Sequence, residues 1–232
     1  MDDRFSSQGT VTAQPAIGSR AQFILRTYNH LLGAIAAFTL LEVAFFKSGL
    51  AETMARAMLG VNWLFVLGGF VLVSWLASRF AHTAQSIGMQ YLGLGMLVFA
   101  EAIIFVPLLY VAQVQAGGGV IESAALVTVL GFAGLTAIVF WTRKDFSFLR
   151  GILMWGGVLA LVAIVGGVLF GFGLGTWFSV AMIGLAGGAI LYDTSNVLHH
   201  FPEDRHVAAS MQLFASVALM FWYVLRLFLN RR

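Results

Sequence analysis

The residue with the most distinctive chemistry in this chain is Asp193, an acid in an apolar segment. It belongs to the stretch from Gly187 to His200, which closes a largely apolar run that begins near Trp177. An ionised carboxylate in hydrocarbon costs at least a few kcal/mol, so an acid inside a membrane span indicates a functional site by default. We therefore expect Asp193 to face a neighbouring helix, and we expect the activity of the protein to depend on its proton.

The side chains that follow in the next apolar run predict a partner for Asp193. The midpoint between Asp193 and Ser216 falls inside the loop at 199–206, so an antiparallel helical hairpin would place them at similar depth. Gln212, Ser216 and Tyr223 fall on one face of that second helix. This polar seam has two interpretations: a proton or ion site, or hydrogen bonds that only hold the two helices together.

Two further acids, Glu42 and Glu101, also fall within apolar runs. Glu42 lies near Lys47 at one end of its run, and we expect it to snorkel to the membrane surface. Glu101 lies near the middle of its run, where it could line an ion path or be buried without one. Because no basic residue is central in any run, these acids require a proton, water or a bound cation.

The composition identifies the solvent around these groups as a lipid bilayer. Of the 232 residues 60% are hydrophobic and only 10% are charged, and the mean hydropathy is +0.91. In hydrocarbon each span must satisfy its own backbone hydrogen bonds, so the spans must be helices. The basic residues are scattered between apolar runs and form no patch for nucleic acid. The absence of cysteine excludes disulfides and thiolate chemistry.

The apolar runs predict an all-α membrane protein with seven transmembrane helices. Each run is long enough to cross about 30 Å of hydrocarbon. The expected spans are 28–46, 59–77, 87–114, 120–141, 152–172, 177–198 and 207–229. Residues 1–24 have the composition of a mobile cytoplasmic N-terminal tail, and residues 25–232 form the transmembrane domain.

The distribution of lysine and arginine predicts which way the helices cross the membrane. With the N-terminus inside, most of the thirteen basic residues are cytoplasmic. Those on the cytoplasmic side are Arg4, Arg20, Arg26, Arg79, Arg143, Lys144, Arg150 and Arg205. We therefore expect a cytoplasmic N-terminus.

The loop before the last span collects groups that could bind a metal or sense pH. These groups are His199, His200, Glu203, Asp204 and His206. Their spacing matches no HExxH zinc motif, and adjacent histidines on a helix point about 100° apart, so we predict no metal site. A hydrated loop whose histidines sense pH is the preferred alternative. No nucleophile elbow or nucleotide-binding glycine loop occurs, so we expect neither catalysis nor a cofactor.

Three short motifs resemble the Bax inhibitor-1 family of membrane proteins, in its bacterial branch. The segment Thr142–Leu149 (TRKDFSFL) is similar to the link before the fifth helix of that family, and Ile190–Ser195 (ILYDTS) to the signature of its sixth helix. Leu25–Asn29 (LRTYN) is similar to the entry of its first helix. The likeness extends from about residue 25 over nearly the whole chain.

The resemblance implies a fold and one candidate function. The fold is two three-helix groups around a central C-terminal helix, in the bacterial inner (plasma) membrane. Some bacterial members leak calcium under the control of a pH-sensitive pair of aspartates, helped by a basic residue near the end of the second helix. Asp193 matches the first aspartate and Arg79 the basic residue, but Ser216 replaces the second aspartate. The implied path is a pH-sensitive leak of calcium or another cation at Asp193, Ser216, Gln212 and Glu101.

A second function is implied by the serine at position 216. Members of the enteric type carry a serine at this position. They bind and restrain a membrane-embedded ATP-dependent protease, and their N-terminal tail is important for this interaction. The sequence leaves both functions open. The expected partners are the lipid bilayer, a cation and a membrane protease.

Overall fold

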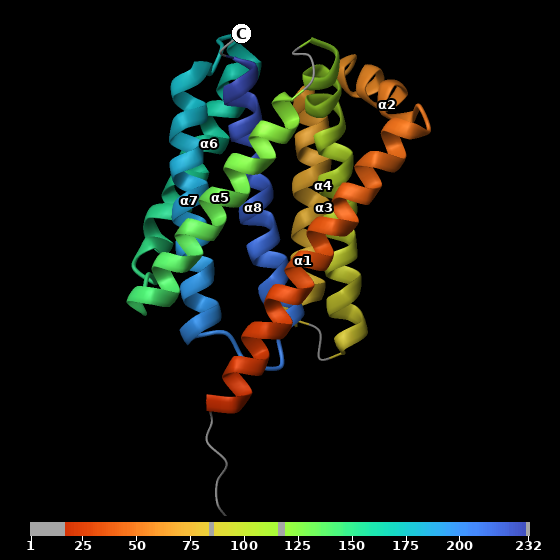
Figure 1. Ribbon diagram of the computed structural model, residues 1–232. Coiled ribbons are helices and arrows are strands. Elements are labelled where there is room, and N and C mark those ends of the chain that lie inside the picture. The colour runs from red at the N-terminus through yellow and green to blue at the C-terminus, as the bar shows by residue number, and fades with distance from the viewer. Residues whose placement is uncertain (1–16, 84–85, 116–118, 231–232) are drawn as a thin grey trace, which may run out of the picture.

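The computed structural model describes residues 17–83, 86–115 and 119–230, which form eight α-helices (Figure 1). No strand occurs among these residues. The helices are α1 (Ile17–Lys47), α2 (Leu50–Leu59), α3 (Trp63–Thr83), α4 (Ile87–Gln115), α5 (Val120–Thr142), α6 (Leu149–Phe170), α7 (Gly175–His199) and α8 (His206–Leu229).

Seven of the helices are long and apolar enough to cross a membrane, which confirms the predicted number of spans. The exception is α2, a helix of 10 residues that the hydropathy pattern did not predict. One side of α2 buries Ala51 and Ala55 against Val106 of α4, while Glu52 and Arg56 form an exposed ion pair on the other side. The chain is therefore a multi-pass membrane protein with one additional short amphipathic helix.

The last helix, α8, lies at the centre of the bundle (Figure 1). It packs against α1, α3, α4, α5 and α7. Thirteen of its 24 residues are buried, compared with two of the 22 residues in the peripheral helix α6. Aromatic rings fix its position: Phe105 of α4 stacks on Phe221 at 5.5 Å and meets Trp222 edge-on at 5.0 Å.

The helices around α8 differ in how closely they associate. On one side α3 packs on α4 and α1 packs on both α2 and α4, while on the other side α7 packs on α5 and α6. Contacts of α1 with α7, of α4 with α5 and of α3 with α6 link the two sides. The division into two three-helix groups thus stays a prediction, although the central place of α8 agrees with it.

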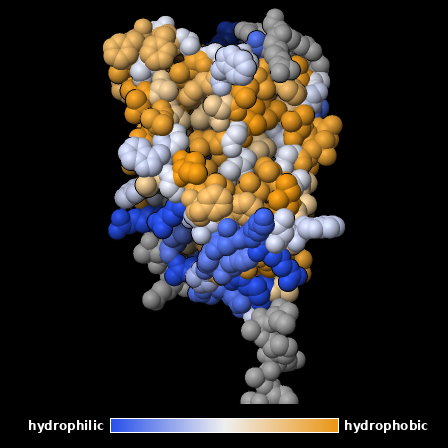
Figure 2. Space-filling model, turned by 90° about the vertical axis from the view of Figure 1, so that its left-hand side faces the viewer, coloured by the Kyte–Doolittle hydropathy of each residue, from blue (hydrophilic) through white to orange (hydrophobic). Residues whose placement is uncertain are grey.

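The outer surface of the bundle is apolar, as contact with lipid requires. Figure 2 shows hydrophobic side chains over most of one face, with a hydrophilic band at one end of the bundle. Aromatic side chains that would be costly in water are almost fully exposed, among them Trp141 (91%) and Trp177 (84%). Their amphipathic rings suit the membrane interface.

The first helix begins earlier than the apolar pattern indicated. Because α1 starts at Ile17, residues 17–24 of the predicted tail are helical. Residues 1–16, the rest of that predicted tail, lie outside the described residues. The N-terminal end of α1 and the C-terminal end of α8 lie at opposite ends of the bundle (Figure 1).

Candidate functional site

Asp193 lies in the interior of the bundle, on the side of α7 that faces α8. Its side chain is only 3% exposed, and the hydroxyl of Ser216 donates a hydrogen bond of 2.5 Å to Asp193 Oδ2. Gln212, one turn earlier on α8, also lies within hydrogen-bonding reach of the carboxyl group. The predicted pairing of these positions across the last two helices is confirmed, and the roles of the three residues remain predictions.

A second set of polar groups lies beside Asp193 on the adjoining face of α7. The hydroxyl of Tyr28 from α1 lies near those of Thr194 from α7 and Thr136 from α5. All three oxygens are buried, and none has a hydrogen bond of good geometry. Polar groups therefore extend from Asp193 toward α1 and α5 within an otherwise apolar interior.

Glu101 lies in a different part of the molecule from Asp193. It is 7% exposed and lines a cavity of about 1190 Å³ between α3, α4, α6, α7 and α8. The walls of this cavity do not include Asp193, Gln212 or Ser216. The structure therefore brings together three of the residues predicted to line one path, and places the fourth elsewhere.

Arg79, the predicted basic partner, lies near the end of α3 on the exposed surface. Its guanidinium stacks over the ring of Trp75, 5.5 Å from the ring centroid. Among the described residues it forms no ion pair with an acid. The position of Arg79 therefore does not support its predicted action on Asp193.

Glu42 is buried, so the prediction that it snorkels to the surface was wrong. It is 7% exposed, and both carboxyl oxygens lack a hydrogen-bond partner among the described residues. It lines a cavity of about 360 Å³ between α1, α4, α5 and α8. The side chain points into the bundle because α1 presents this face to α4 and α8, a choice that hydropathy alone does not reveal.

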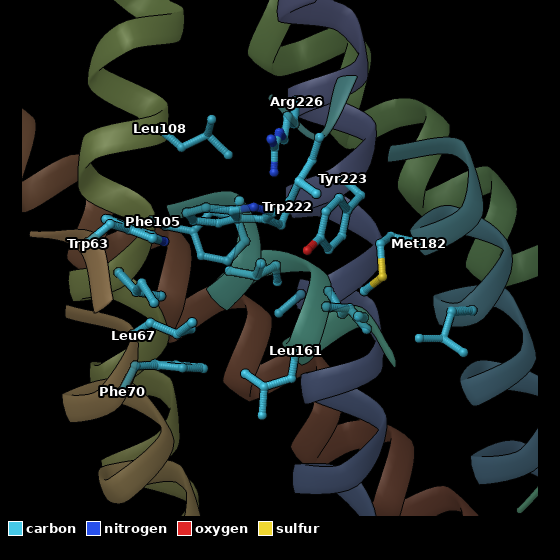
Figure 3. Close-up of a pocket in the computed structure, with 18 of the residues that line it drawn as sticks. Trp63, Leu67, Phe70, Phe105, Leu108, Leu161, Met182, Trp222, Tyr223 and Arg226 are labelled. Atoms are coloured by element: carbon cyan, nitrogen blue, oxygen red, sulfur yellow. The ribbon is translucent and has the colours of Figure 1, made fainter. Parts of the chain in front are cut away.

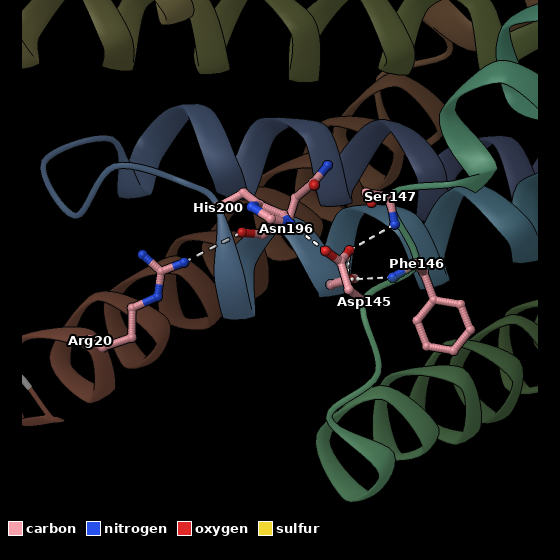
Figure 4. Close-up of polar contacts among 7 residues, drawn as sticks. Arg20, Asp145, Phe146, Ser147, Asn196 and His200 are labelled. Carbon is pink, nitrogen blue, oxygen red and sulfur yellow. Dashed lines mark hydrogen bonds and ion pairs between the residues drawn. The ribbon is translucent and has the colours of Figure 1, made fainter.

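The end of α7 nearest Asp193 is held by a polar latch, which we define as Asp145, Ser147, Ser195 and His200 (Figure 4). Asp145 Oδ2 contacts His200 Nε2 at 2.9 Å, and the backbone N–H of Ser147 donates to Asp145 Oδ1 at 2.8 Å. Ser195 Oγ donates to the same oxygen at 3.4 Å. The latch joins the link between α5 and α6 to the end of α7, at Ser195, two residues beyond Asp193, and at His200, about two turns beyond it.

The latch changes the acidity of its carboxyl group. The hydrogen bond from the Ser147 backbone, followed by the contact with His200, lowers the pKa of Asp145 to about 2. Asp145 is therefore ionised throughout the physiological range. Its contact with His200 becomes an ion pair when that histidine is protonated.

Arg20 from the start of α1 binds the same end of α7 (Figure 4). Its guanidinium donates to the carbonyl oxygens of Phe201 at 2.5 Å and Leu198 at 3.2 Å. Leu198 lies in the last turn of α7 and Phe201 lies just beyond the helix, where carbonyl oxygens have no partner within the helix, so a cation satisfies them well. These hydrogen bonds hold the start of α1 against the end of α7, the helix that carries Asp193.

The family model for the inhibitor of apoptosis-promoting Bax1 matches residues 20–232. The chain belongs to the Bax inhibitor-1 family. This match covers all eight helices except the first three residues of α1, so it includes Asp193, Ser216 and the latch.

Several known proteins are similar to part of this Bax inhibitor-1 protein. The Escherichia coli protein named modulator of FtsH protease YccA is 37% identical over 105 residues, which cover 45% of this chain and 48% of the relative. An uncharacterized Pseudomonas aeruginosa protein is 36% identical over 113 residues, covering 48% and 50%. A BI1-like protein of Arabidopsis thaliana is 32% identical over 118 residues, covering 47% and 45%. The matched segments thus span about half the length of these relatives.

In this Bax inhibitor-1 protein the three predicted loop histidines do not act as one group. His200 joins the latch, His199 is exposed, and His206 packs edge-on against His30 of α1 with ring centroids 4.9 Å apart. His30 in turn binds the hydroxyl of Tyr91 from α4 at 2.6 Å. The described residues contain no cluster of three or more histidine, aspartate or glutamate side chains able to hold a metal ion.

Sequence reasoning missed three of these polar contacts, those made by Asp145, Arg20 and His30. Asp145 stands within the quoted motif TRKDFSFL, so the motif contained the acid but gave no sign of its partner. Arg20 was interpreted only as a topology signal, and His30 only as a part of the first predicted span. Only the packing of α1 against α4, α7 and α8 gives Arg20 and His30 their partners.

Proposed function

We propose that this protein is a non-enzymatic membrane protein that binds a membrane-embedded ATP-dependent protease and modulates its action. The observation that carries the proposal is the 37% identity to the Escherichia coli protein that is named as a modulator of the FtsH protease. A second relative, from Escherichia coli O6:H1, is named inner membrane protein YccA, which supports the bacterial inner membrane as the location.

The end of the bundle that holds Arg20 and the latch suits such a partner. Three segments remote in sequence meet there: the start of α1, the link between α5 and α6, and the end of α7. Arg143, Lys144 and Arg150 in and beside that link are exposed and have no acid partner among the described residues. We infer that this basic surface, together with the segment before Ile17, contacts the cytoplasmic part of the protease.

The test is recovery of the protease with the full-length protein after crosslinking in native membranes. We expect the parent to retain the protease, and we expect a deletion of residues 2–16 or the double change R143E/K144E to reduce its recovery. The matched control is K47E, which reverses an exposed charge at the opposite end of the bundle. Equal recovery from parent and all variants, with unchanged turnover of the protein, would overturn the proposal.

A second candidate function, a pH-sensitive cation leak, is favoured by one observation: a buried acid at the contact of α7 with α8. Asp193 accepts a short hydrogen bond from Ser216 and has no basic partner among the described residues. A carboxyl group of this kind can exchange a proton for a cation. Because calcium prefers several charged oxygens, the serine at position 216 makes a monovalent cation or a proton as good a candidate as calcium.

The leak is tested by cation flux into liposomes between pH 5 and pH 8. We expect D193N to abolish the pH dependence, and we expect S216D to sharpen it by supplying a second acid. S179A, which alters a buried hydroxyl elsewhere on α7, serves as the control. Flux that is the same for the parent and D193N would remove this candidate and leave the protease proposal untouched.

A further inference from the structure

The cavity that Glu101 lines has the form of a site for an amphipathic molecule. Its volume of about 1190 Å³ exceeds the range of about 300–1,000 Å³ typical of pockets for small ligands. Most of its wall is apolar, with Leu67, Phe70 and Leu161 facing the space in Figure 3. A molecule that fills it must offer a long apolar part.

One end of the cavity carries a positive charge without a counter-charge. Arg226, in the last turn of α8, extends toward the space above Tyr223 and Trp222 (Figure 3). Among the described residues its guanidinium forms no ion pair and no hydrogen bond. A half-buried guanidinium beside an apolar cavity is best satisfied by a carboxylate or phosphate, because its planar donors match both.

The depth of these groups matches one monolayer of a membrane. Arg226 and Asn230 mark the end of α8 at the membrane surface, whereas Glu101 lies near the middle of α4. The polar mouth is therefore at the interface, and the apolar body reaches toward the bilayer centre. A charged headgroup buried beside Glu101 would lose its hydration without gaining a basic partner, so an anionic amphiphile has only one favourable orientation.

The lipid bilayer has direct access to the cavity. The helices α3 and α6 form two walls of the cavity and make few contacts with each other. The side chains of Leu161 and Val168 on α6 line the cavity and are also exposed on the apolar outer surface. An acyl chain can enter between these helices without leaving hydrocarbon.

We propose that this cavity binds an anionic glycerophospholipid from the leaflet at the C-terminal end of the bundle. The phosphate binds Arg226, and one acyl chain lies between α3 and α6 against Leu67, Phe70 and Leu161. Basic pockets between transmembrane helices recognise anionic headgroups in this way. The site is separate from Asp193 and from the basic surface at the other end of the molecule.

The test is native mass spectrometry of the full-length protein, titrated with phosphatidylglycerol or with phosphatidylcholine of the same acyl chains. We expect the parent to retain phosphatidylglycerol preferentially and R226Q to lose about tenfold in affinity for it, the loss expected for one charge-assisted contact. K47Q, which removes an exposed charge at the same end of the bundle, should bind like the parent.

A second variant separates loss of the site from loss of the fold. Gly157 lines the cavity, and a Cβ atom added there meets no atom within 4 Å, so the side chain of G157F starts in open space and should fill part of the cavity. We expect G157F to keep the thermal stability of the parent and to lose the bound lipid. Equal retention of both lipids by the parent, or unchanged phosphatidylglycerol affinity in R226Q, would overturn the proposal. Displacement of the lipid by free oleate at equal concentration would also overturn it, in favour of a fatty-acid site.

Discussion

At the scale of single residues, the interior of this protein separates its acids into different environments. Asp193 is buried and hydrogen-bonded, Glu42 is buried without a partner, and Asp145 is held by donors at the membrane surface. The same side-chain chemistry can therefore serve an ion site, a structural contact or a surface latch. The groups that surround each acid determine which of these roles it can have, and the residue type alone does not.

The hydrogen bond between Ser216 and Asp193 should contribute to stability. We expect S216A to lower the free energy of unfolding by about 1–3 kcal/mol, because a buried acceptor loses its donor. Thermal unfolding of the purified protein in detergent measures this effect. The control is S179A, which removes another buried hydroxyl, one that has no hydrogen-bond partner among the described residues. A loss of the same size in S179A would show that the Ser216 contact is not special.

The latch should make stability depend on pH in the acid range. Asp145 has a folded pKa of about 2, below its ordinary value of about 3.9, so the folded state binds this proton less readily than the unfolded state. Its contribution is therefore complete above about pH 4 and is lost as the pH falls from about 4 to about 2.

Unfolding midpoints measured between pH 2 and pH 6 test this linkage. We expect D145N to be less stable than the parent at pH 6, with the difference disappearing near pH 2. D204N, at an exposed acid that approaches Arg205 only at 4.0 Å, should follow the parent. A constant difference between D145N and the parent over this range would contradict the assignment.

At the scale of helices, close approach depends on small residues at particular positions. The contact of α3 with α4 is the most extensive in the bundle, and Gly93 lies where the two backbones meet. A methyl group at Gly93 would lie 2.6 Å from the carbonyl oxygen of Ala77 and 2.9 Å from the backbone nitrogen of Ala81. Any side chain at this position must push the helices apart.

We expect G93A to destabilise the protein by about 1–3 kcal/mol, the usual cost of overpacking. Its matched control on the same helix is G95A, where an added methyl group meets nothing within 4 Å and alanine favours the helix by up to about 1 kcal/mol. Thermal unfolding of both variants checks this. The prediction fails if the two substitutions have the same effect.

At the scale of the whole molecule, the odd number of spans among the described residues places the start of α1 and the end of α8 on opposite sides of the membrane. The basic link between α5 and α6 and the loop between α7 and α8 share one end of the bundle. The distribution of lysine and arginine predicts that this end is cytoplasmic. The protease proposal depends on this orientation, because its basic surface must face the cytoplasm.

The orientation can be measured because the chain contains no native cysteine. We expect a membrane-impermeant thiol reagent applied to intact cells to label E122C, at the start of α5, and to spare D204C, in the loop before α8. Both sites are exposed in the structure, so accessibility from the protein side is equal. Labelling of D204C alone would reverse the predicted topology.

The sequence by itself determined the seven helical spans, because only self-satisfied helices are stable in hydrocarbon and their length is set by the bilayer. It also determined the pairing of Asp193 with Ser216, because a short loop fixes the relative depth of two antiparallel helices. The central place of α8 came from the family resemblance and not from the hydropathy pattern.

Only the tertiary structure decided which face of each helix is buried and which distant groups meet. Lipid is as apolar as the protein interior, so the hydropathy pattern cannot tell a face that contacts lipid from one that contacts another helix. The burial of Glu42, the cavity beside Arg226 and the binding of Arg20 to Leu198, 178 positions away, all depend on that choice. The lateral packing of the helices determines which face of each helix is buried, and no local sequence pattern predicts it.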